Sequence, residues 1–220
     1  MGFSDLLYKI FIADGGWLTI LNGLWVTVQI SALSLLLGTL FGAVLCFFRV
    51  GKFKPLKLVA QIYISIIRGS PVLMLLMLLF YGVLARTGLS PVVVAVVTFS
   101  MHTAAHVAEL LRSSLMALDK GQVEAARTLG FSKWQAFKLV TLPQLARIAK
   151  PVYQSTVVNL IQWTSVVGYV TITDLTRVIN NIASRTMQPM ITITGGMIIY
   201  LALSYIVYGI FHWTERRRGQ

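Results

Sequence analysis

The sequence has 220 residues, of which 56% are hydrophobic and only 12% are charged, and its formal net charge is +12. A soluble domain of this length needs a larger polar share to cover its surface, so the composition argues against one and predicts a single integral membrane domain, residues 1–220. The basic balance does not by itself indicate nucleic-acid binding, which would need basic and aromatic side chains clustered on one soluble face.

Five apolar runs are long enough to cross a hydrocarbon core of about 30 Å as helices. We therefore expect an all-α integral membrane protein whose five transmembrane helices lie at residues 18–48, 58–85, 92–111, 152–170 and 190–211. The first run holds the single cysteine, Cys46, and is too long for a cleaved signal peptide. Within the second run, the sequence Arg68-Gly69-Ser70-Pro71 combines a charge with two helix breakers and predicts an interruption.

The positions of Lys and Arg predict the orientation of these spans. Fourteen of them fall in the 49–57 turn, the 112–150 segment and the C-terminus, which lie on one side, and four fall on the other side. Since cytoplasmic loops carry the excess of positive charge, we expect the N-terminus outside and the C-terminus inside. The charge is then a topology signal of a multi-pass protein in a lipid bilayer, with no nucleic-acid partner.

A polar stretch interrupts the apolar pattern between the third and fourth runs, on the side assigned to the cytoplasm. Asp119 with Gln122 has capping-box spacing, and Ser132 with Gln135 repeats it. Gly130 between them can end the first helix in a left-handed conformation. These signals predict a helix–glycine–helix elbow. An amphipathic connector lying on lipid headgroups would show the same features, so this alternative stays open on physical grounds.

The residue pattern of this stretch resembles the cytoplasmic loop motif of the permease subunits of ATP-binding-cassette (ABC) importers. Its elements are Glu124-Ala125-Ala126, three residues, Gly130, nine residues, Val140 (where the family usually has Ile), one residue, and Leu142-Pro143. The resemblance implies that residues 119–143 form a coupling loop whose first helix sits in a groove of a separate ATPase subunit. The residues expected at that contact are Gln122, Glu124, Ala125, Ala126, Leu129 and Gly130.

Three further segments are similar to permeases for polar amino acids. They are "YISIIRGSP" (63–71), "HTAAHVAELLRSSLMALDKGQVEAA" (102–126) and "LPQLARIAKPV" (142–152). Ser70 replaces a usual Thr, and His102 and His106 replace a usual Asn and Tyr. In the fourth run, Gln162-Trp163 stands where the family often has Lys-Asp.

This resemblance implies an ATP-driven importer of polar amino acids that lies in a bacterial cytoplasmic (inner) membrane and works by alternating access. Its partners would be a dimer of ABC ATPase subunits, a second permease (identical or paralogous) and an extracytoplasmic amino-acid-binding protein. The chain has no G-x-x-x-x-G-K-[ST] phosphate loop, so we expect no catalytic residues and no cofactor here, with ATP and Mg²⁺ on the partner subunit. The alternatives are a paralogous partner that gives coupling but little substrate contact, an importer of an amino-acid derivative such as an opine, and an exporter or channel without an ATPase.

Ionisable residues of the third run share one helical face. His102, His106 and Glu109 are spaced by four and three residues. Such groups usually face a cavity or one another, so they either line the substrate path or hydrogen-bond to neighbouring helices. Glu109 would hold an ammonium group of the substrate or pair with Arg112. Two His at this spacing are half of a zinc site, but no further ligands accompany them, and we expect no metal.

The fourth run contains the other candidates for the substrate path, Asn159, Gln162, Thr164 and Ser165. Hydroxyls within a span also bond back to their own helix carbonyls, which is the competing explanation. Trp163 between them is better explained by packing than by cation binding. Beyond this run, Asp174 and Arg177 form a surface pair or touch a docked binding protein.

Overall fold

The computed structural model describes residues 8, 12 and 15–216, and this part of the chain contains helices and turns but no strand. The long helices are α2 (Gly16–Val50), α5 (Pro91–Met116), α8 (Leu142–Trp163) and α10 (Pro189–Arg216). The shorter elements are α3 (Lys54–Gly69), α4 (Val72–Met77), the π-helix η3 (Leu78–Val83), α6 (Lys120–Thr128), α7 (Lys133–Ala136), the π-helix η4 (Phe137–Thr141), the 3₁₀-helix η5 (Thr164–Val170) and α9 (Leu175–Thr186).

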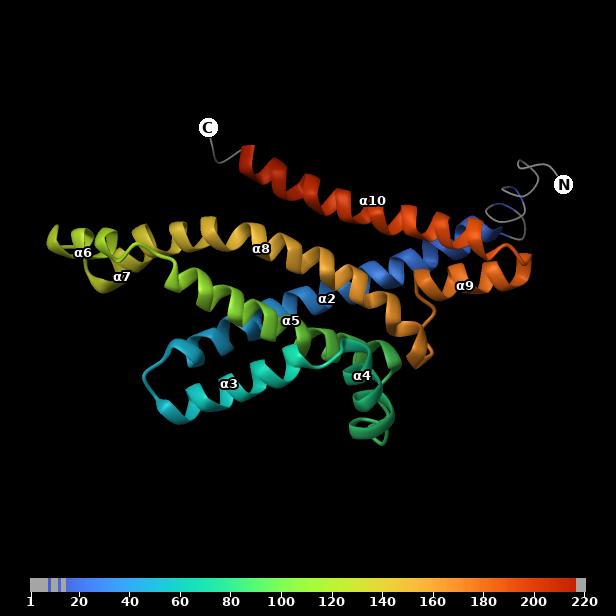
Figure 1. Cartoon of the computed structure of the whole chain (residues 1–220), viewed down its shortest axis with the longest axis horizontal. Coiled ribbons are helices and arrows are strands. Elements are labelled where there is room, and N and C mark those ends of the chain that lie inside the picture. The colour runs from blue at the N-terminus through green and yellow to red at the C-terminus, as the bar shows by residue number, and fades with distance from the viewer. Residues whose placement is uncertain (1–7, 9–11, 13–14, 217–220) are drawn as a thin grey trace.

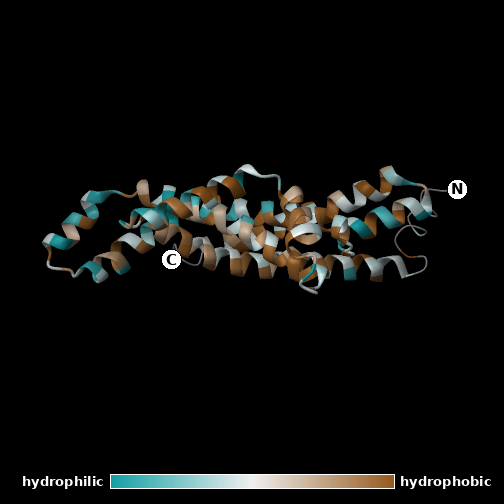
Figure 2. Cartoon of the chain, turned by 90° about the horizontal axis from the view of Figure 1, so that it is seen from below, coloured by the Kyte–Doolittle hydropathy of each residue, from teal (hydrophilic) through white to brown (hydrophobic). Residues whose placement is uncertain are grey.

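The long helices run side by side along the length of the molecule (Figure 1). Helices α6 and α7 project at one end, and α9 lies at the opposite end beside the start of α2. Hydrophilic residues are frequent at the α6–α7 end and hydrophobic residues fill the middle (Figure 2). This distribution is the one that a membrane-crossing bundle with a polar projection requires.

Length and hydropathy qualify three helices of the described part as candidate spans: α2, α5 and residues 189–214 of α10. A fourth candidate is the pair α3 and α4–η3, if the two count as one broken span. Helix α8 is not among them. The expectation of an all-helical membrane protein is therefore confirmed, whereas the count of five spans remains a prediction, because the fourth expected run (152–170) is not among the candidates.

The expected interruption at Arg68–Pro71 is a sharp bend. Helix α3 ends at Gly69, and the direction of the chain changes by 108° before α4 and η3. Ser70 and Pro71 are both extended, with φ and ψ of −94° and 136° and of −60° and 129°. Proline removes a backbone donor and pushes the preceding residue out of the helical region, which explains the break.

Small residues let α2 and α5 approach closely. A Cβ added at Gly38 would lie 2.6 Å from the Cβ of Thr103, and one at Gly42 would lie 2.7 Å from the Cβ of Val107. No side chain fits in either place, because real Cβ atoms do not come so near another carbon. Close packing through small residues is a common way for membrane helices to associate.

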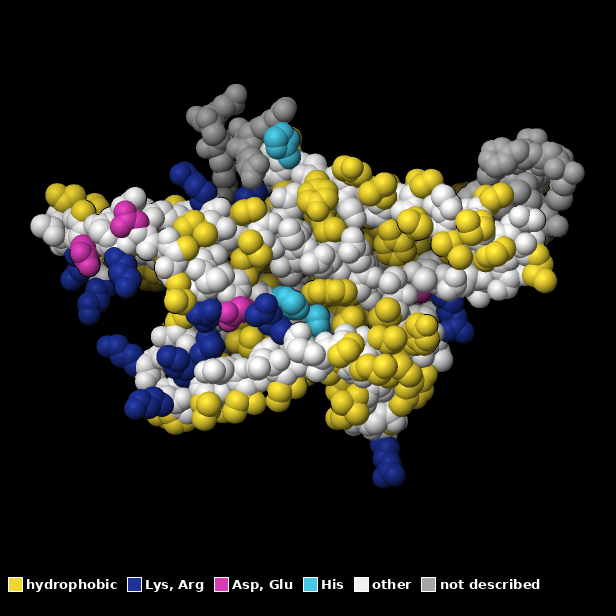
Figure 3. Space-filling model, viewed as in Figure 1, with side chains coloured by type: hydrophobic (Ala, Val, Ile, Leu, Met, Phe, Trp, Pro, Cys, Tyr) yellow, Lys and Arg dark blue, Asp and Glu magenta, His cyan; other side chains and the backbone are white. Residues whose placement is uncertain are grey.

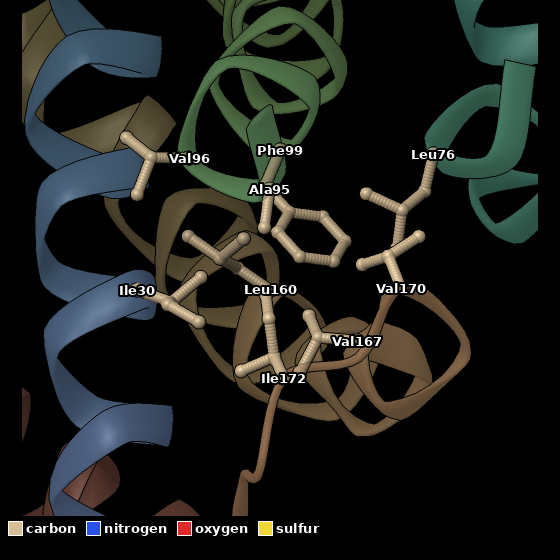
Figure 4. Close-up of a cluster of buried hydrophobic side chains, with 9 residues drawn as sticks. All are labelled: Ile30, Leu76, Ala95, Val96, Phe99, Leu160, Val167, Val170 and Ile172. Carbon is tan, nitrogen blue, oxygen red and sulfur yellow. The ribbon is translucent and has the colours of Figure 1, made fainter. Parts of the chain in front are cut away.

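A buried apolar cluster joins the break to the long helices (Figure 4). Leu76 of α4 packs there with Phe99 of α5, Leu160 of α8 and Val170 of η5. Its other members are Ile30, Ala95, Val96, Val167 and Ile172. The cluster fixes the bent segment and the end of α8 against α5, next to the polar residues described below.

The elbow continues directly into α8. Helix α8 begins at Leu142, ten residues before the expected start at 152, with η4 leading into it. Pro143 fits because a proline in the first turn removes a donor that has no partner there. At Thr164 the α-helix gives way to η5, so the second half of the expected fourth run is a 3₁₀-helix.

Candidate coupling elbow and intramembrane polar cluster

The elbow predicted from the sequence is present. Asp119 caps α6, but its carboxylate accepts from the backbone N of Gly121 at 2.9 Å, and Gln122 does not complete the expected capping box. At α7 the box is complete: Ser132 Oγ accepts from Gln135 N at 3.2 Å, and Gln135 Oε1 accepts from Ser132 N at 2.8 Å.

Gly130 makes the bend between the two helices. Its φ of +88° lies in the left-handed region, and the next backbone N, that of Phe131, donates to the carbonyl of Ala126 at 3.2 Å. The Arg127 guanidinium also donates to the carbonyl of Phe131. The turn between α6 and α7 is thus held by hydrogen bonds on both sides of the glycine.

The outer surface of the elbow is unusually apolar for an exposed polar segment. Leu129 is 79% exposed and Trp134 is 68% exposed, and the ring of Trp134 stacks on Phe137 at 5.7 Å between centroids. Of the six residues expected at the ATPase contact, Ala126 is buried within the elbow and the other five are exposed. Exposed aromatic and apolar groups gathered on one surface are typical of a site that contacts another protein or the membrane.

One contact that sequence reasoning missed joins the elbow to the bundle. Gln144 Nε2, in the first turn of α8, donates to Gln122 Oε1 in α6 at 2.8 Å. Gln144 belongs to the segment "LPQLARIAKPV", so the resemblance included it, but no local pattern indicates its partner 22 residues away.

Inside the bundle, His102, His106 and Trp163 form a compact group, called here the His–Trp cluster. The His102 ring lies 4.9 Å from His106 and 4.5 Å from Trp163, and His106 lies 5.1 Å from Trp163, all between centroids. Among the described residues, His102 Nδ1 is buried without a hydrogen-bond partner. No group of three or more His, Cys, Asp or Glu in that part of the chain could hold a metal ion.

Charged groups continue from this cluster toward the elbow end. Glu109 forms an ion pair with Arg112, whose Nε donates to Glu109 Oε2 at 2.9 Å. Arg68 at the helix break lies within electrostatic range of both His106 and Glu109, and Arg49 within range of Glu109. Figure 3 shows a row of charged and histidine side chains on the face between α5 and α3.

The candidates from the fourth run do not join this row. Thr164 is buried, and its hydroxyl donates to the carbonyl of Ile161 at 2.7 Å, as the competing explanation expects. Gln162 and Ser165 line a different cavity of about 610 Å³, between the end of α8, α9 and α10. Asn159 is exposed on α8.

Asp174 and Arg177 do not form the surface pair that we expected as one alternative. Asp174 is fully buried and caps α9, accepting from Arg177 N at 3.0 Å and Thr176 N at 3.1 Å. The Arg177 guanidinium instead donates to the carbonyl of Gly168 at 2.7 Å. Burial raises the pKa of the Asp174 carboxyl, although the two backbone donors oppose the shift.

These features define an all-helical membrane protein with a capped helix pair projecting from its bundle and a polar cluster inside it. Residues 20–220 match the family of binding-protein-dependent transport system inner membrane components, and the chain belongs to this family. The membership confirms the resemblance found in the elbow motif. Members of the family are transport permease subunits.

Individual relatives cover most of the chain. It is 30% identical to the L-cystine transport system permease protein TcyB of Bacillus subtilis over 203 residues, 91% of this chain and 87% of that protein. It is 33% identical to the glutamate/aspartate import permease protein GltK of Escherichia coli O157:H7, over 84% of this chain and 88% of that protein. Among solved structures, an amino acid ABC transporter with histidines matches at 29% identity and a TM-score of 0.81, over 90% of this chain and 94% of that one.

Proposed function

We propose that this chain is the membrane-spanning subunit of an ATP-driven importer of polar amino acids. The observation that carries the proposal is the elbow: two capped helices joined at a left-handed Gly130, projecting from an apolar bundle and followed without a break by α8. TcyB and GltK are named for the transport of amino acids, and the matching solved structure is that of an amino acid ABC transporter, so all three support this substrate class.

The elbow is the proposed contact with a separate ATPase subunit. When two ATPase subunits close on ATP, they displace the elbow, and the continuity of η4 with α8 carries that displacement into the bundle. One chain offers one such elbow, so two permease subunits serve the two ATPase subunits. An extracytoplasmic binding protein would deliver the substrate at the opposite end.

Helix α8, which begins the fourth expected run, is the proposed remaining span of the five. Its 22 residues measure roughly 33 Å along the axis, enough to cross the hydrocarbon core. Its polar residues do not rule this out, because a helix that faces other helices and a water-filled path does not need an apolar surface all round. With five spans, the elbow and the end of α10 lie on the same side of the membrane, and the distribution of Lys and Arg supports the cytoplasm as that side.

The proposed substrate path follows the row of polar side chains from the His–Trp cluster to Glu109. His106 and Trp163 offer aromatic faces, His102 a buried ring nitrogen without a partner among the described residues, and Arg68 a guanidinium for a carboxylate. Asn159 and the Gln162–Ser165 cavity extend the path on the other side of α8. A zwitterionic amino acid carries both charges that this row complements.

The second candidate function is a paralogous subunit that transmits force while its partner binds the substrate. The Glu109–Arg112 ion pair and the inward-turned Thr164 favour it, because both groups already have partners within the chain. The substrate is identified by measuring uptake in the reconstituted complex while acidic, basic and amide amino acids are added as competitors. Replacing His106 by Ala then separates the two functions, since only a substrate-contacting subunit would change the order of the competitors.

The coupling role is tested with a matched pair of glycines. Gly130 and Gly88 both have positive φ, +88° and +69°, and open space where a Cβ would stand. Val at either position imposes a similar backbone strain. We expect Gly130→Val to release the ATPase subunit during purification and Gly88→Val to retain it. Equal retention in both variants would contradict the proposed coupling role.

A further inference from the structure

An apolar groove runs along the outside of the bundle between α2 and α5, with Tyr63 of α3 at its side. Its volume is about 480 Å³. Its lining includes Leu37, Phe41, Val44 and Phe48 of α2, Tyr63 of α3 and Met101 of α5. Phe41 is 59% exposed and Val44 is 49% exposed, so the groove opens outward. From Leu37 to Phe48 it extends roughly 16 Å along α2, about the length of a lipid acyl chain.

The groove ends at a concentration of positive charge. Phe48 is its last residue on α2, and the next turn begins the segment with Arg49, Lys52, Lys54 and Lys57, called here the basic turn. The three lysines are exposed. Figure 3 shows Lys and Arg side chains gathered toward this end of the molecule.

No acidic residue balances the basic turn locally. The sequence contains neither Asp nor Glu between residues 15 and 108. The carboxylate of Glu109 is already paired with Arg112. Arg49 Nη1 donates to the side-chain oxygen of Gln61, which is neutral, at 3.1 Å. Arg49 Nε is buried and has no acceptor in that part of the chain. Among the described residues, the basic turn thus has no carboxylate partner of its own, and Glu109, which lies within electrostatic range of Arg49, is paired with Arg112.

We propose that the groove and the basic turn form a binding site for an anionic phospholipid of the inner leaflet. The acyl chain lies along α2 from Phe48 toward Leu37, and the phosphate meets Lys52 and its neighbours. The positive charge of the basic turn is by itself explained by the orientation of the protein in the membrane, and it does not require a bound lipid. The apolar groove that ends at the same turn gives the site a place for the acyl chain as well as for the phosphate. A free phosphate has no acyl chain and would not occupy the groove. Basic pockets beside membrane helices recognise anionic lipids in this way.

The test uses the importer complex purified with its ATPase from nanodiscs that contain equal amounts of phosphatidylglycerol and phosphatidylcholine. Native mass spectrometry counts the lipids that remain bound. We expect phosphatidylglycerol to be retained in preference, and Lys52→Gln/Lys54→Gln to reduce its retention roughly tenfold. Lys133→Gln/Lys138→Gln, which removes the same charge from the elbow, is the matched control and should retain the lipid.

A groove variant and a soluble competitor complete the design. Val44→Trp fills the mouth of the groove without changing charge and should release the lipid as the lysine variant does. Equal retention of the two lipids, or equal retention in the lysine variant and its control, would overturn the proposal. So would displacement by soluble glycerol phosphate, which would define a plain anion site. Loss of permease pairing in Val44→Trp with its lipid kept would define a protein interface instead.

Discussion

The side-chain nitrogen of Gln144, in the first turn of α8, lies 2.8 Å from the side-chain oxygen of Gln122 in α6. This hydrogen bond joins the projecting helix of the elbow to the helix that enters the bundle. The covalent path between the same two residues passes through Gly130 and a π-helix, both of which are places where a helix deforms easily. In the proposed coupling role, the amide pair would give force a shorter path from α6 to α8 than the covalent chain does.

Gln144→Ala should weaken the link between ATP hydrolysis and uptake. A neutral hydrogen bond contributes about 1 kcal/mol, so we expect a loss of roughly fivefold in substrate transported per ATP hydrolysed. The measurement is uptake and ATPase activity in the same proteoliposomes. Gln29→Ala, an exposed amide on α2, is the control and should leave the ratio unchanged. An unchanged ratio in Gln144→Ala would show that the amide pair carries no force.

Gly38→Val should prevent α2 and α5 from packing. The new Cβ would stand 2.6 Å from Thr103 Cβ, so one helix has to move, at a cost of about 1–3 kcal/mol or more. Gly209→Ala is the control, because nothing lies within 4 Å of its new methyl group. The thermal unfolding midpoint of the purified complex measures both. A midpoint for Gly38→Val equal to that of the wild type would contradict the observed packing.

The elbow was predicted well from the sequence because its signals are local. Ser132 and Gln135 form the expected capping box, and Gly130 has the expected positive φ. Asp119 caps α6 as expected, but Gln122 turns to Gln144. The side chain of Gln122 can bond either to the backbone at the start of α6 or to another amide nearby. Spacing along the chain does not reveal a partner such as Gln144, which folding brings close.

The intramembrane candidates were less predictable for the same reason. Helical spacing places His102 and His106 on one face, and the structure brings them together at 4.9 Å. Spacing cannot say that Trp163 joins them, that Thr164 turns toward its own helix, or that Gln162 faces α9 and α10. Successive residues of a helix point about 100° apart, so these neighbours face different helices. No sequence signal marked the change from α-helix to 3₁₀-helix at Thr164.

Exchanging the charges of Glu109 and Arg112 separates two roles of Glu109, the structural ion pair and the proposed contact with the substrate. Glu109→Arg/Arg112→Glu restores an ion pair of opposite order at the same two positions, so we expect stability near that of the wild type. Uptake should be lost, because the carboxylate then lies one helical turn from its place in the proposed path. The measurements are thermal unfolding and uptake of the competing amino acids. Normal uptake by this variant would assign Glu109 a purely structural role.

Asp174 should make the stability of the complex depend on pH. Burial raises its pKa in the folded state above the ordinary value, so folding favours the protonated form. Its contribution to stability is complete below the ordinary carboxyl pKa and is lost as the pH rises through the folded-state pKa. Asp174→Asn cannot ionise and keeps an acceptor oxygen for one of the two backbone donors of α9, Arg177 N or Thr176 N, which contact different oxygens of the carboxylate. We expect its unfolding midpoint to vary less between pH 4 and pH 7 than that of the wild type, and an identical pH dependence would contradict this assignment.

Cross-linking from position 129 tests most directly whether the elbow meets the ATPase in the cytoplasm. Leu129 is 79% exposed at the tip of the elbow, so a photo-reactive residue such as benzoylphenylalanine fits there without disturbing the bundle. The account predicts a cross-linked product with the ATPase subunit when cells that produce the whole complex are irradiated. A product with the extracytoplasmic binding protein, or no product with the ATPase in a complex that still transports, would contradict it.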